Sequence, residues 1–103
     1  VRSAAADWSV YPLGTKFKIK GEPYTYIVDD YGSALVGTAT IDIYHPSKAL
    51  MRKWATRIVE IEVIEWGAPT RSMQQLAGRR GYKHCLRMYA ALERQMQAAQ
   101  NKG

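Results

Sequence analysis

The chain has 103 residues, of which 47% are hydrophobic and 23% charged, a composition typical of one folded domain and not of a disordered segment. No apolar run approaches the ~20 residues of a membrane-spanning helix, and residues 1–4 do not form a signal peptide. The formal net charge is +6, and residues 67–103 carry all of it, because they hold seven basic groups and one acid while residues 1–66 hold eight of each.

The single cysteine, Cys85, excludes an intrachain disulfide and a cysteine zinc site. His84 directly precedes Cys85 and would point elsewhere on a helix, which disfavours a thiol nucleophile. His45 and His84 do not have metal-ligand spacing. Asp29 and Asp30 are adjacent, and adjacent strand residues face opposite sides of a sheet. We therefore expect no metal and no cofactor.

Residues 8–66 have the pattern of β-structure. Polar and apolar residues alternate over 16–20 and, most regularly, over 59–66, while β-branched and aromatic residues are concentrated in 24–28. The predicted strands cover residues 16–20, 24–28, 34–36, 40–44 and 59–66, and a short helix with Ser47 as its N-cap covers 46–54. Short strands separated by glycine and proline indicate a small barrel or sandwich.

Residues 68–103 are predicted to form a basic helical extension beyond a β-domain of residues 1–67. A short helix is expected over 72–77, with Ser72 as its N-cap, and a longer one from residue 82 to about 97. The predicted packing face of the longer helix holds Leu86, Tyr89, Leu92 and Met96. The positive charge indicates either an anionic partner or a solvated helix face whose long side chains cover the domain.

Three aspartates, Asp7, Asp30 and Asp42, stand at the edges of predicted strands or turns. Ile41 and Ile43 share one face of their strand, so Asp42 takes the other, where we expect it to be partly desolvated. Breaking a glycosidic bond needs a carboxylic acid that is protonated near neutral pH. A single aspartate in such a place is more often a turn cap, but the three together indicate acid chemistry.

Three blocks of the sequence resemble the 3D (three-aspartate) domain. They are Ala-Asp-x-Ser-x-x-Pro-Leu-Gly-Thr at 6–15, Asp-x-Gly-x-Ala-Leu-x-Gly at 30–37 and Ile-Asp-Ile-Tyr at 41–44. That domain occurs in the membrane-bound lytic transglycosylase A family and in small stationary-phase and spore-germination wall enzymes. The resemblance covers residues 4–66 and implies a mainly β fold, a six-stranded double-psi β-barrel with the short helix inserted.

The resemblance also implies an activity, the non-hydrolytic cleavage of the β-1,4 bond between N-acetylmuramic acid and N-acetylglucosamine, which leaves a 1,6-anhydro end. Asp42 matches the catalytic acid/base, and Asp30 and Asp7 match two supporting aspartates of the same groove. The residues expected to contact the sugar, or alternatively to pack the barrel, are Trp8, Tyr31, Gly32, Ser33 and Tyr44. Such an enzyme acts on peptidoglycan strands in the cell envelope, periplasmic or secreted, without nucleic acid, and its basic extension can contact anionic wall polymers.

The sequence departs from the family pattern in several places. Val36 replaces a common lysine, Trp8 replaces a common proline, and Asp30 and Asp42 are twelve positions apart, one more than usual. A β-bulge in that interval would keep Asp42 on its face. Only six residues precede Asp7, so an upstream strand of the family is expected to be missing. These departures keep open a glycan-binding module without catalysis, and the basic tail keeps open a nucleic-acid binder.

Overall fold

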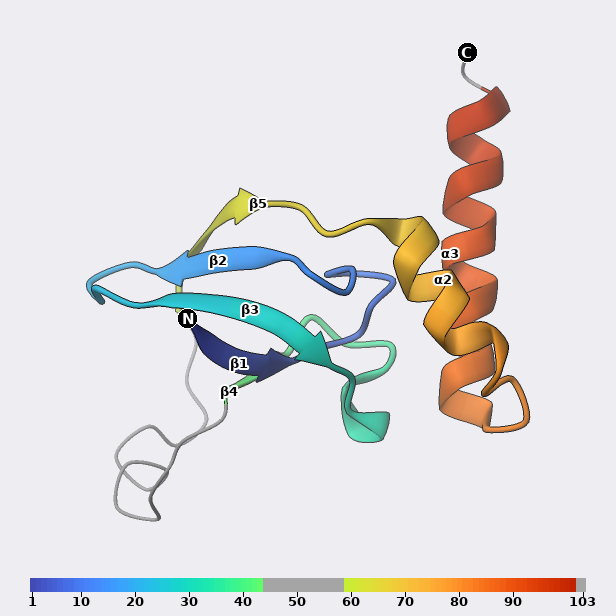
Figure 1. Cartoon of the computed structure of the whole chain (residues 1–103), viewed down its shortest axis with the longest axis horizontal. Coiled ribbons are helices and arrows are strands. Elements are labelled where there is room, and N and C mark those ends of the chain that lie inside the picture. The colour runs from blue at the N-terminus through green and yellow to red at the C-terminus, as the bar shows by residue number, and fades with distance from the viewer. Residues whose placement is uncertain (44–58, 102–103) are drawn as a thin grey trace.

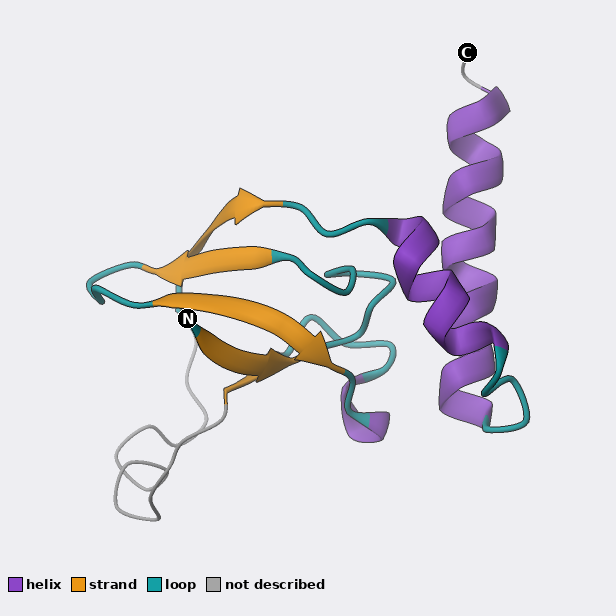
Figure 2. Ribbon diagram, viewed as in Figure 1, coloured by secondary structure: helices purple, strands orange, loops and turns teal. Residues whose placement is uncertain are grey.

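The computed structural model describes residues 1–43 and 59–101. In chain order the elements are β1 (Arg2–Ala5), β2 (Lys16–Ile19), β3 (Thr25–Asp30), the 3-10 helix η1 (Ser33–Leu35), β4 (Asp42–Ile43), β5 (Ile61–Glu65), α2 (Pro69–Ala77) and α3 (Lys83–Asn101). The strands form one sheet, and the two α-helices lie at one end of it (Figures 1 and 2).

The described strands form a mixed sheet in the order β4-β1-β3-β2-β5. Strands β1 and β3 run parallel, whereas the β1–β4, β2–β3 and β2–β5 pairs are antiparallel. Within the described residues β4 and β5 are the two edge strands, and no pairing joins them. Of the expected six-stranded β-barrel with a C-terminal helical extension, the described residues show a mixed five-stranded sheet and two C-terminal helices, and no barrel closure is detected among them.

The three strands with the clearest sequence pattern are confirmed as β2, β3 and β5. The strand predicted over 34–36 is wrong, because this stretch forms η1 and the adjoining turn. Its backbone bonds are local: Leu35 N donates to Gly32 O at 2.9 Å, and Thr38 N donates to Leu35 O at 3.0 Å. The helix predicted over 46–54 lies outside the described residues.

Strand β1 lies upstream of Asp7, so the expectation that the upstream strand is missing is wrong. Its residues, Arg2–Ala5, include two alanines, which have low β propensity. Pairing on both sides, with β3 and with β4, holds this stretch in an extended conformation. The register between β1 and β3 shifts after Ala4, which faces Val28, while Ala5 faces Asp30. One extra residue of β3, Asp29, therefore bulges out of the ladder.

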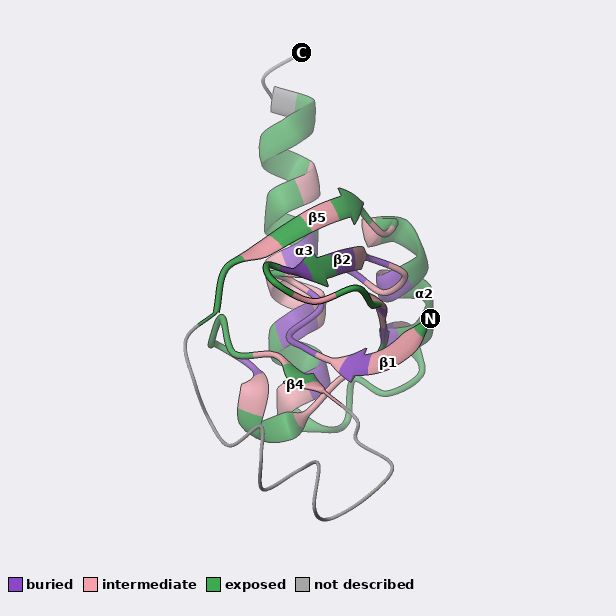
Figure 3. Cartoon of the chain, turned by 90° about the vertical axis from the view of Figure 1, so that its left-hand side faces the viewer, coloured by how far each residue is buried: buried purple, intermediate pink, exposed green. Residues whose placement is uncertain are grey.

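The helices are part of the core. Leu76, Cys85, Met88 and Leu92 are fully buried in one cluster with residues of the sheet and of the β1–β2 loop. Three bonds join this loop to the helices. Trp8 N donates to Met88 Sδ at 3.4 Å, Leu13 N donates to Ser72 Oγ at 2.8 Å, and Gln95 Nε2 donates to the backbone oxygen of Ser9 at 2.7 Å. Figure 3 shows buried stretches of α3 behind the sheet, while its far end is exposed. The extension both packs on the sheet and projects from it.

Two details of the predicted helices are corrected. Helix α2 begins at Pro69, so Ser72 lies within its first turns and its hydroxyl binds the β1–β2 loop instead of capping the helix. Leu86 is 47% exposed, so it does not belong to the packing face of α3. The buried face of that helix is Cys85, Met88 and Leu92, a spacing of three and four residues.

Candidate active site

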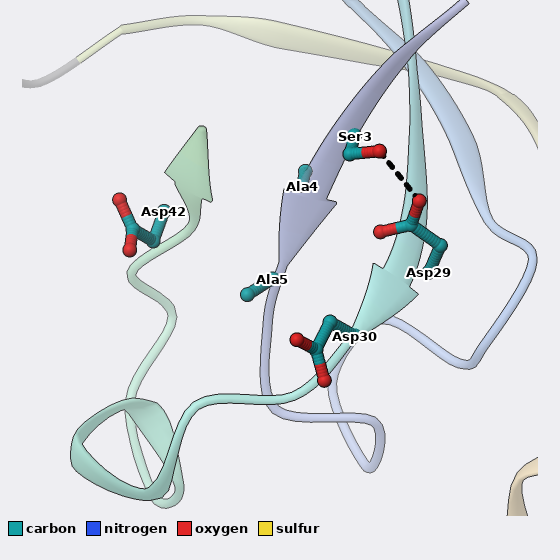
Figure 4. Close-up of a pocket in the computed structure, with 6 residues that line it drawn as sticks. All are labelled: Ser3, Ala4, Ala5, Asp29, Asp30 and Asp42. Carbon is teal, nitrogen blue, oxygen red and sulfur yellow. Dashed lines mark hydrogen bonds between the residues drawn. The ribbon is translucent and has the colours of Figure 1, made fainter. Parts of the chain in front are cut away.

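A pocket of about 400 Å³ opens where β4, β1 and β3 lie side by side (Figure 4). Its volume falls within the usual range for small-molecule sites. The residues that line it are Ser3, Ala4, Ala5, Asp29, Asp30 and Asp42. Three carboxyl groups therefore converge on one hollow, and every other lining residue is small.

The strand register places Asp30 and Asp42 on either side of Ala5. Ala5 is paired with Asp30 on the parallel neighbour β3 and with Asp42 on the antiparallel neighbour β4. Because neighbouring strands lie about 4.8 Å apart, the two aspartate backbones are separated by about 10 Å. Only the short methyl group of Ala5 stands between the two aspartates in this part of the sheet (Figure 4).

The bulge in β3 brings Asp29 into the same pocket as Asp30. In a regular strand the two side chains would point to opposite faces, as the sequence predicted, and that prediction is wrong at this position. Asp29 Oδ2 accepts a hydrogen bond of 2.6 Å from Ser3 Oγ, and Asp30 Oδ1 accepts one of 2.8 Å from Tyr31 N. The Asp29 carboxyl group is thus held by a residue of β1, and the Asp30 carboxyl group by the backbone of the residue that follows β3.

Asp42 lies on the predicted face but in a different environment from the one expected. Ile41 and Ile43 are half-buried and Asp42 is exposed, so the alternation along β4 is confirmed. The expected partial desolvation of Asp42 is wrong, because the residue is exposed on a two-residue edge strand. The twelve-residue separation between Asp30 and Asp42 is spanned by η1 and its flanking loops, and the pairing of β4 with β1 contains no bulge.

Asp7 lies outside the pocket. Its side chain is buried, with 3% exposure, and it accepts three hydrogen bonds. Ser9 N and Ser9 Oγ donate to Oδ1 at 2.8 and 2.7 Å, and Gly37 N donates to Oδ2 at 2.7 Å. Gly37 has a φ of +86°, a conformation that favours glycine. Asp7 thus clamps the turn after η1, contrary to the expectation that it lines the groove.

Trp8 also belongs to the interior. It is 5% exposed, so its ring is not open to a sugar face, contrary to one of the two interpretations of this residue. Its Nε1 donates to the backbone oxygen of Asp30 at 2.9 Å, and Ala6 N donates to the same oxygen at 3.2 Å. These two bonds fix the end of β3 at the point where Asp30 enters the pocket.

Tyr31 faces the helices. Its ring meets Trp8 edge-on, with centroids 5.2 Å apart, and lies 5.5 Å from the ring of His84. Its hydroxyl accepts a 2.9 Å hydrogen bond from Arg79 Nη1. A hydrogen bond with the buried Cys85 thiol raises the pKa of Tyr31, and the Arg79 guanidinium acts in the opposite direction. Tyr31 is therefore a link between the pocket strand and the α2–α3 turn.

The remaining predicted contacts lie around η1. Gly32 precedes this helix and Ser33 begins it, on the connection between Asp30 and Asp42, and neither lines the pocket. Tyr44 lies outside the described residues. Four lining residues, Ser3, Ala4, Ala5 and Asp29, were not predicted from the sequence, and two of them, Ser3 and Asp29, are polar. The hydroxyl of Ser3 in an otherwise alanine-rich stretch was the available signal, whereas the bulge at Asp29 had none.

Other chemistry is limited in the described part of the chain. Among residues 1–43 and 59–101, no cluster of three or more histidine, cysteine or acidic side chains has a geometry that could hold a metal ion. Neither described α-helix has an apolar stretch long enough to cross a membrane.

Comparison with known proteins identifies the family. Residues 2–69 match the model of the 3D domain, which is more than half of the chain and includes all five described strands. Searches of curated proteins and of solved structures found no match. The 3D domain is found in transglycosylases of the membrane-bound lytic transglycosylase A type and in other cell-wall proteins. The sequence blocks, the family match and the pocket between β4, β1 and β3 agree, and the chain belongs to the 3D domain family.

Proposed function

We propose that this protein is a peptidoglycan lytic transglycosylase that cleaves the N-acetylmuramic acid–β-1,4–N-acetylglucosamine bond. The observation that carries the proposal is the pair Asp30 and Asp42, which face one open pocket from either side of Ala5 in a 3D domain. A glycan strand is long and narrow, and an open hollow at a sheet edge can take such a chain without an entry channel. The proposed place of action is the cell envelope.

In the proposed mechanism Asp42 serves as both acid and base. Its carboxyl group donates a proton to the glycosidic oxygen while the bond from that oxygen to C1 of muramic acid breaks. The resulting carboxylate takes the proton of the muramic acid 6-hydroxyl, whose oxygen then bonds to C1. Proton and electron pairs balance without water, and the product is a 1,6-anhydro sugar. Because the nucleophile belongs to the substrate, one carboxyl group suffices, unlike the paired acids of ordinary glycosidases.

The other pocket residues have supporting roles. Positive charge develops on C1 and the ring oxygen as the bond breaks, and fixed negative groups stabilise it. Asp29 and Asp30 supply such groups, oriented by Ser3 Oγ and by Tyr31 N. Trp8, whose indole holds the backbone of Asp30, is a positioning residue. Asp7 acts at greater distance, through the turn at Gly37.

The test is digestion of purified peptidoglycan followed by mass spectrometry of the soluble muropeptides. The wild-type protein should release 1,6-anhydro products, and Asp42→Asn should release none while keeping its melting temperature. Glu62→Gln is the matched control, since Glu62 is an exposed carboxyl group on β5, at the opposite edge of the sheet. Products with hydrated reducing ends would refute the cyclising mechanism, and cleavage by Asp42→Asn would refute the assignment of the acid.

A second candidate is a glycan-binding module without catalysis. The exposure of Asp42 favours this candidate, because a catalytic acid is usually kept protonated near neutral pH by burial in an apolar environment. This candidate predicts that wild-type protein and Asp42→Asn both sediment with peptidoglycan and that neither releases soluble fragments. The digestion therefore separates the two candidates in one assay.

A further inference from the structure

The two C-terminal helices lie almost wholly outside the match to the 3D domain, which ends at residue 69. Together with the turn between them they carry most of the unbalanced positive charge of the chain. Two arginines of this region, Arg79 in the turn and Arg87 on α3, reach the segment that joins the pocket aspartates. Arg79 Nη1 donates to the hydroxyl of Tyr31, and Arg87 Nη2 lies so close to Gly37 that an added Cβ would come within 2.8 Å of it. Both cations thus flank residues 31–37.

A hydrogen bond to Tyr31 holds Arg79, and both cations have donors to spare. Both arginines are exposed. Within the described residues the ion pairs are Lys16–Glu65 and Lys20–Glu60, so no described carboxylate forms an ion pair with Arg79 or Arg87. A guanidinium has five N–H donors, and Arg79 uses one of them on Tyr31. The Tyr31 ring packs on Trp8, and this contact restricts the position of the hydroxyl to which Arg79 donates.

The charge around the pocket is divided. Asp29, Asp30 and Asp42 line the hollow itself, and an anion there would meet three acidic side chains. Arg79 and Arg87 lie beside Tyr31 and Gly37, in the segment that follows β3, and neither lines the hollow. A ligand that fits this pattern is neutral where it enters the pocket and carries an anionic branch a short distance away. Guanidinium groups bind carboxylates through paired hydrogen bonds.

Peptidoglycan has this distribution of charge. Its sugars are neutral, and each muramic acid carries a lactyl-linked stem peptide with free carboxylates. We propose that Arg79 and Arg87 bind carboxylates of the stem peptide, so that the protein selects peptide-bearing strands over bare glycan. The inference rests on the proposed function, since it takes the pocket to hold the glycan, and it adds the part of the substrate that the helices recognise.

The experiment measures co-sedimentation with peptidoglycan from which phosphate polymers have been removed with hydrofluoric acid. One half is left with its stem peptides, and the other is stripped of them by an amidase. Wild-type protein should bind the peptide-bearing material about tenfold more tightly. The double variant Arg79→Gln/Arg87→Gln should lose that preference. The matched control is Arg71→Gln/Arg94→Gln, which removes the same charge from exposed positions of α2 and α3 and should keep it.

Further variants separate recognition from bracing. Tyr31→Phe removes the hydroxyl that holds Arg79 but keeps both cations, so the preference should fall by less than in the double variant. A loss in Tyr31→Phe as complete as in the double variant would assign Arg79 a bracing role and overturn the proposal. Equal loss in the Arg71/Arg94 control would show diffuse attraction to charge, with the same consequence. Melting temperatures of all variants show which of them fold.

The outcomes also distinguish this inference from the proposed function. Sedimentation needs no cleavage, so selective binding without anhydro products would support the inference and refute catalysis. Anhydro products from peptide-bearing and stripped strands alike, with equal binding of both, would support catalysis and overturn the inference. Binding that appears only before the phosphate polymers are removed would identify wall phosphate as the anion and would also overturn it.

Discussion

Asp7 and Asp42 both belong to the aspartate pattern of the 3D domain, yet the structure uses them in opposite ways. Asp7 is buried, and its two carboxylate oxygens accept three hydrogen bonds from Ser9 and Gly37. Asp42 is exposed on a two-residue edge strand and faces an open pocket. The same side chain therefore holds a turn in one region and is available to a ligand in the other.

The difference shows what separates a structural acid from a reactive one. A buried carboxylate whose two oxygens both accept hydrogen bonds from its own chain stabilises the fold and is closed to a substrate. A carboxyl group with open neighbours contributes little to stability but can exchange protons with a ligand. Asp30 lies between these cases, since one of its oxygens accepts from Tyr31 N while its side chain still lines the pocket.

The largest expected effect on this comparison comes from Asp42→Ala. Loss of a general acid and base should lower the cleavage rate by about 10²–10⁴-fold. The free energy of unfolding should change by less than about 0.5 kcal/mol, because the side chain is exposed. Anhydro-muropeptide release and urea unfolding measure the two quantities. A clear loss of stability would show that Asp42 is a structural acid like Asp7 and would contradict the difference drawn between them.

Asp7→Asn should show the reverse pattern. An amide can replace only one of the two acceptor oxygens, so either Ser9 or Gly37 loses its partner in a buried place. We expect the free energy of unfolding to fall by about 2–3 kcal/mol. Urea unfolding at neutral pH measures this change, with Asp30→Asn, at an exposed position, as the matched control. If Asp7→Asn were as stable as the control, the hydrogen bonds of Asp7 to Ser9 and Gly37 would contribute nothing measurable to the free energy of unfolding.

Ala5→Val sharpens the comparison from the side of the pocket. The added methyl groups would stand between Asp30 and Asp42, where the register leaves only the Ala5 side chain. Cleavage or glycan binding should fall about tenfold, while valine, a good strand former, should preserve β1. Ala39→Val is the control, because Ala39 is exposed and does not line the pocket. Unchanged binding by Ala5→Val would place the glycan elsewhere.

The smallest effect concerns a second buried polar group. Two effects raise the pKa of Tyr26 to about 12: the larger is burial, and the second is the hydrogen bond from its hydroxyl to Glu22. In the unfolded chain this phenol ionises near its ordinary pKa of about 10. The folded state therefore keeps its proton while the unfolded state loses it, so stability falls as the pH rises from about 10 toward 12.

Tyr26→Phe should remove this part of the alkaline loss. Urea unfolding at pH 9, 10 and 11 would show the wild-type curve falling relative to that of the variant, with no pH dependence of the difference below pH 9. Parallel curves over the whole range would mean that the phenol is not protected in the folded state.

The sequence predicted much of the chain correctly, for identifiable reasons. Strands β2, β3 and β5 follow from alternation and β-branched residues, and the longer C-terminal helix follows from its apolar spacing. The family blocks marked Asp30 and Asp42, which the structure brings to one pocket. Local pattern is sufficient in these cases, since each element carries its own periodic signal.

Other features follow only from contacts between segments distant in sequence. Strand β1 is built from residues of low β propensity, and its two partners hold it extended. Asp29 enters the pocket through a bulge that reverses the normal alternation. Asp7 and Trp8 carry polar groups but are buried, because Gly37 and the backbone of Asp30 supply their partners. No period in the sequence encodes these partners.

The amino-acid sequence by itself thus determined the family, the clearest strands and helices, and two of the aspartates at the pocket. Tertiary structure decided which acid is a clamp and which is open, and it brought Arg79 and Arg87 against residues 31–37. The physical reason is that sequence patterns report the burial of apolar faces. The use of a polar group depends on which donor or acceptor, often dozens of residues away, the fold places beside it.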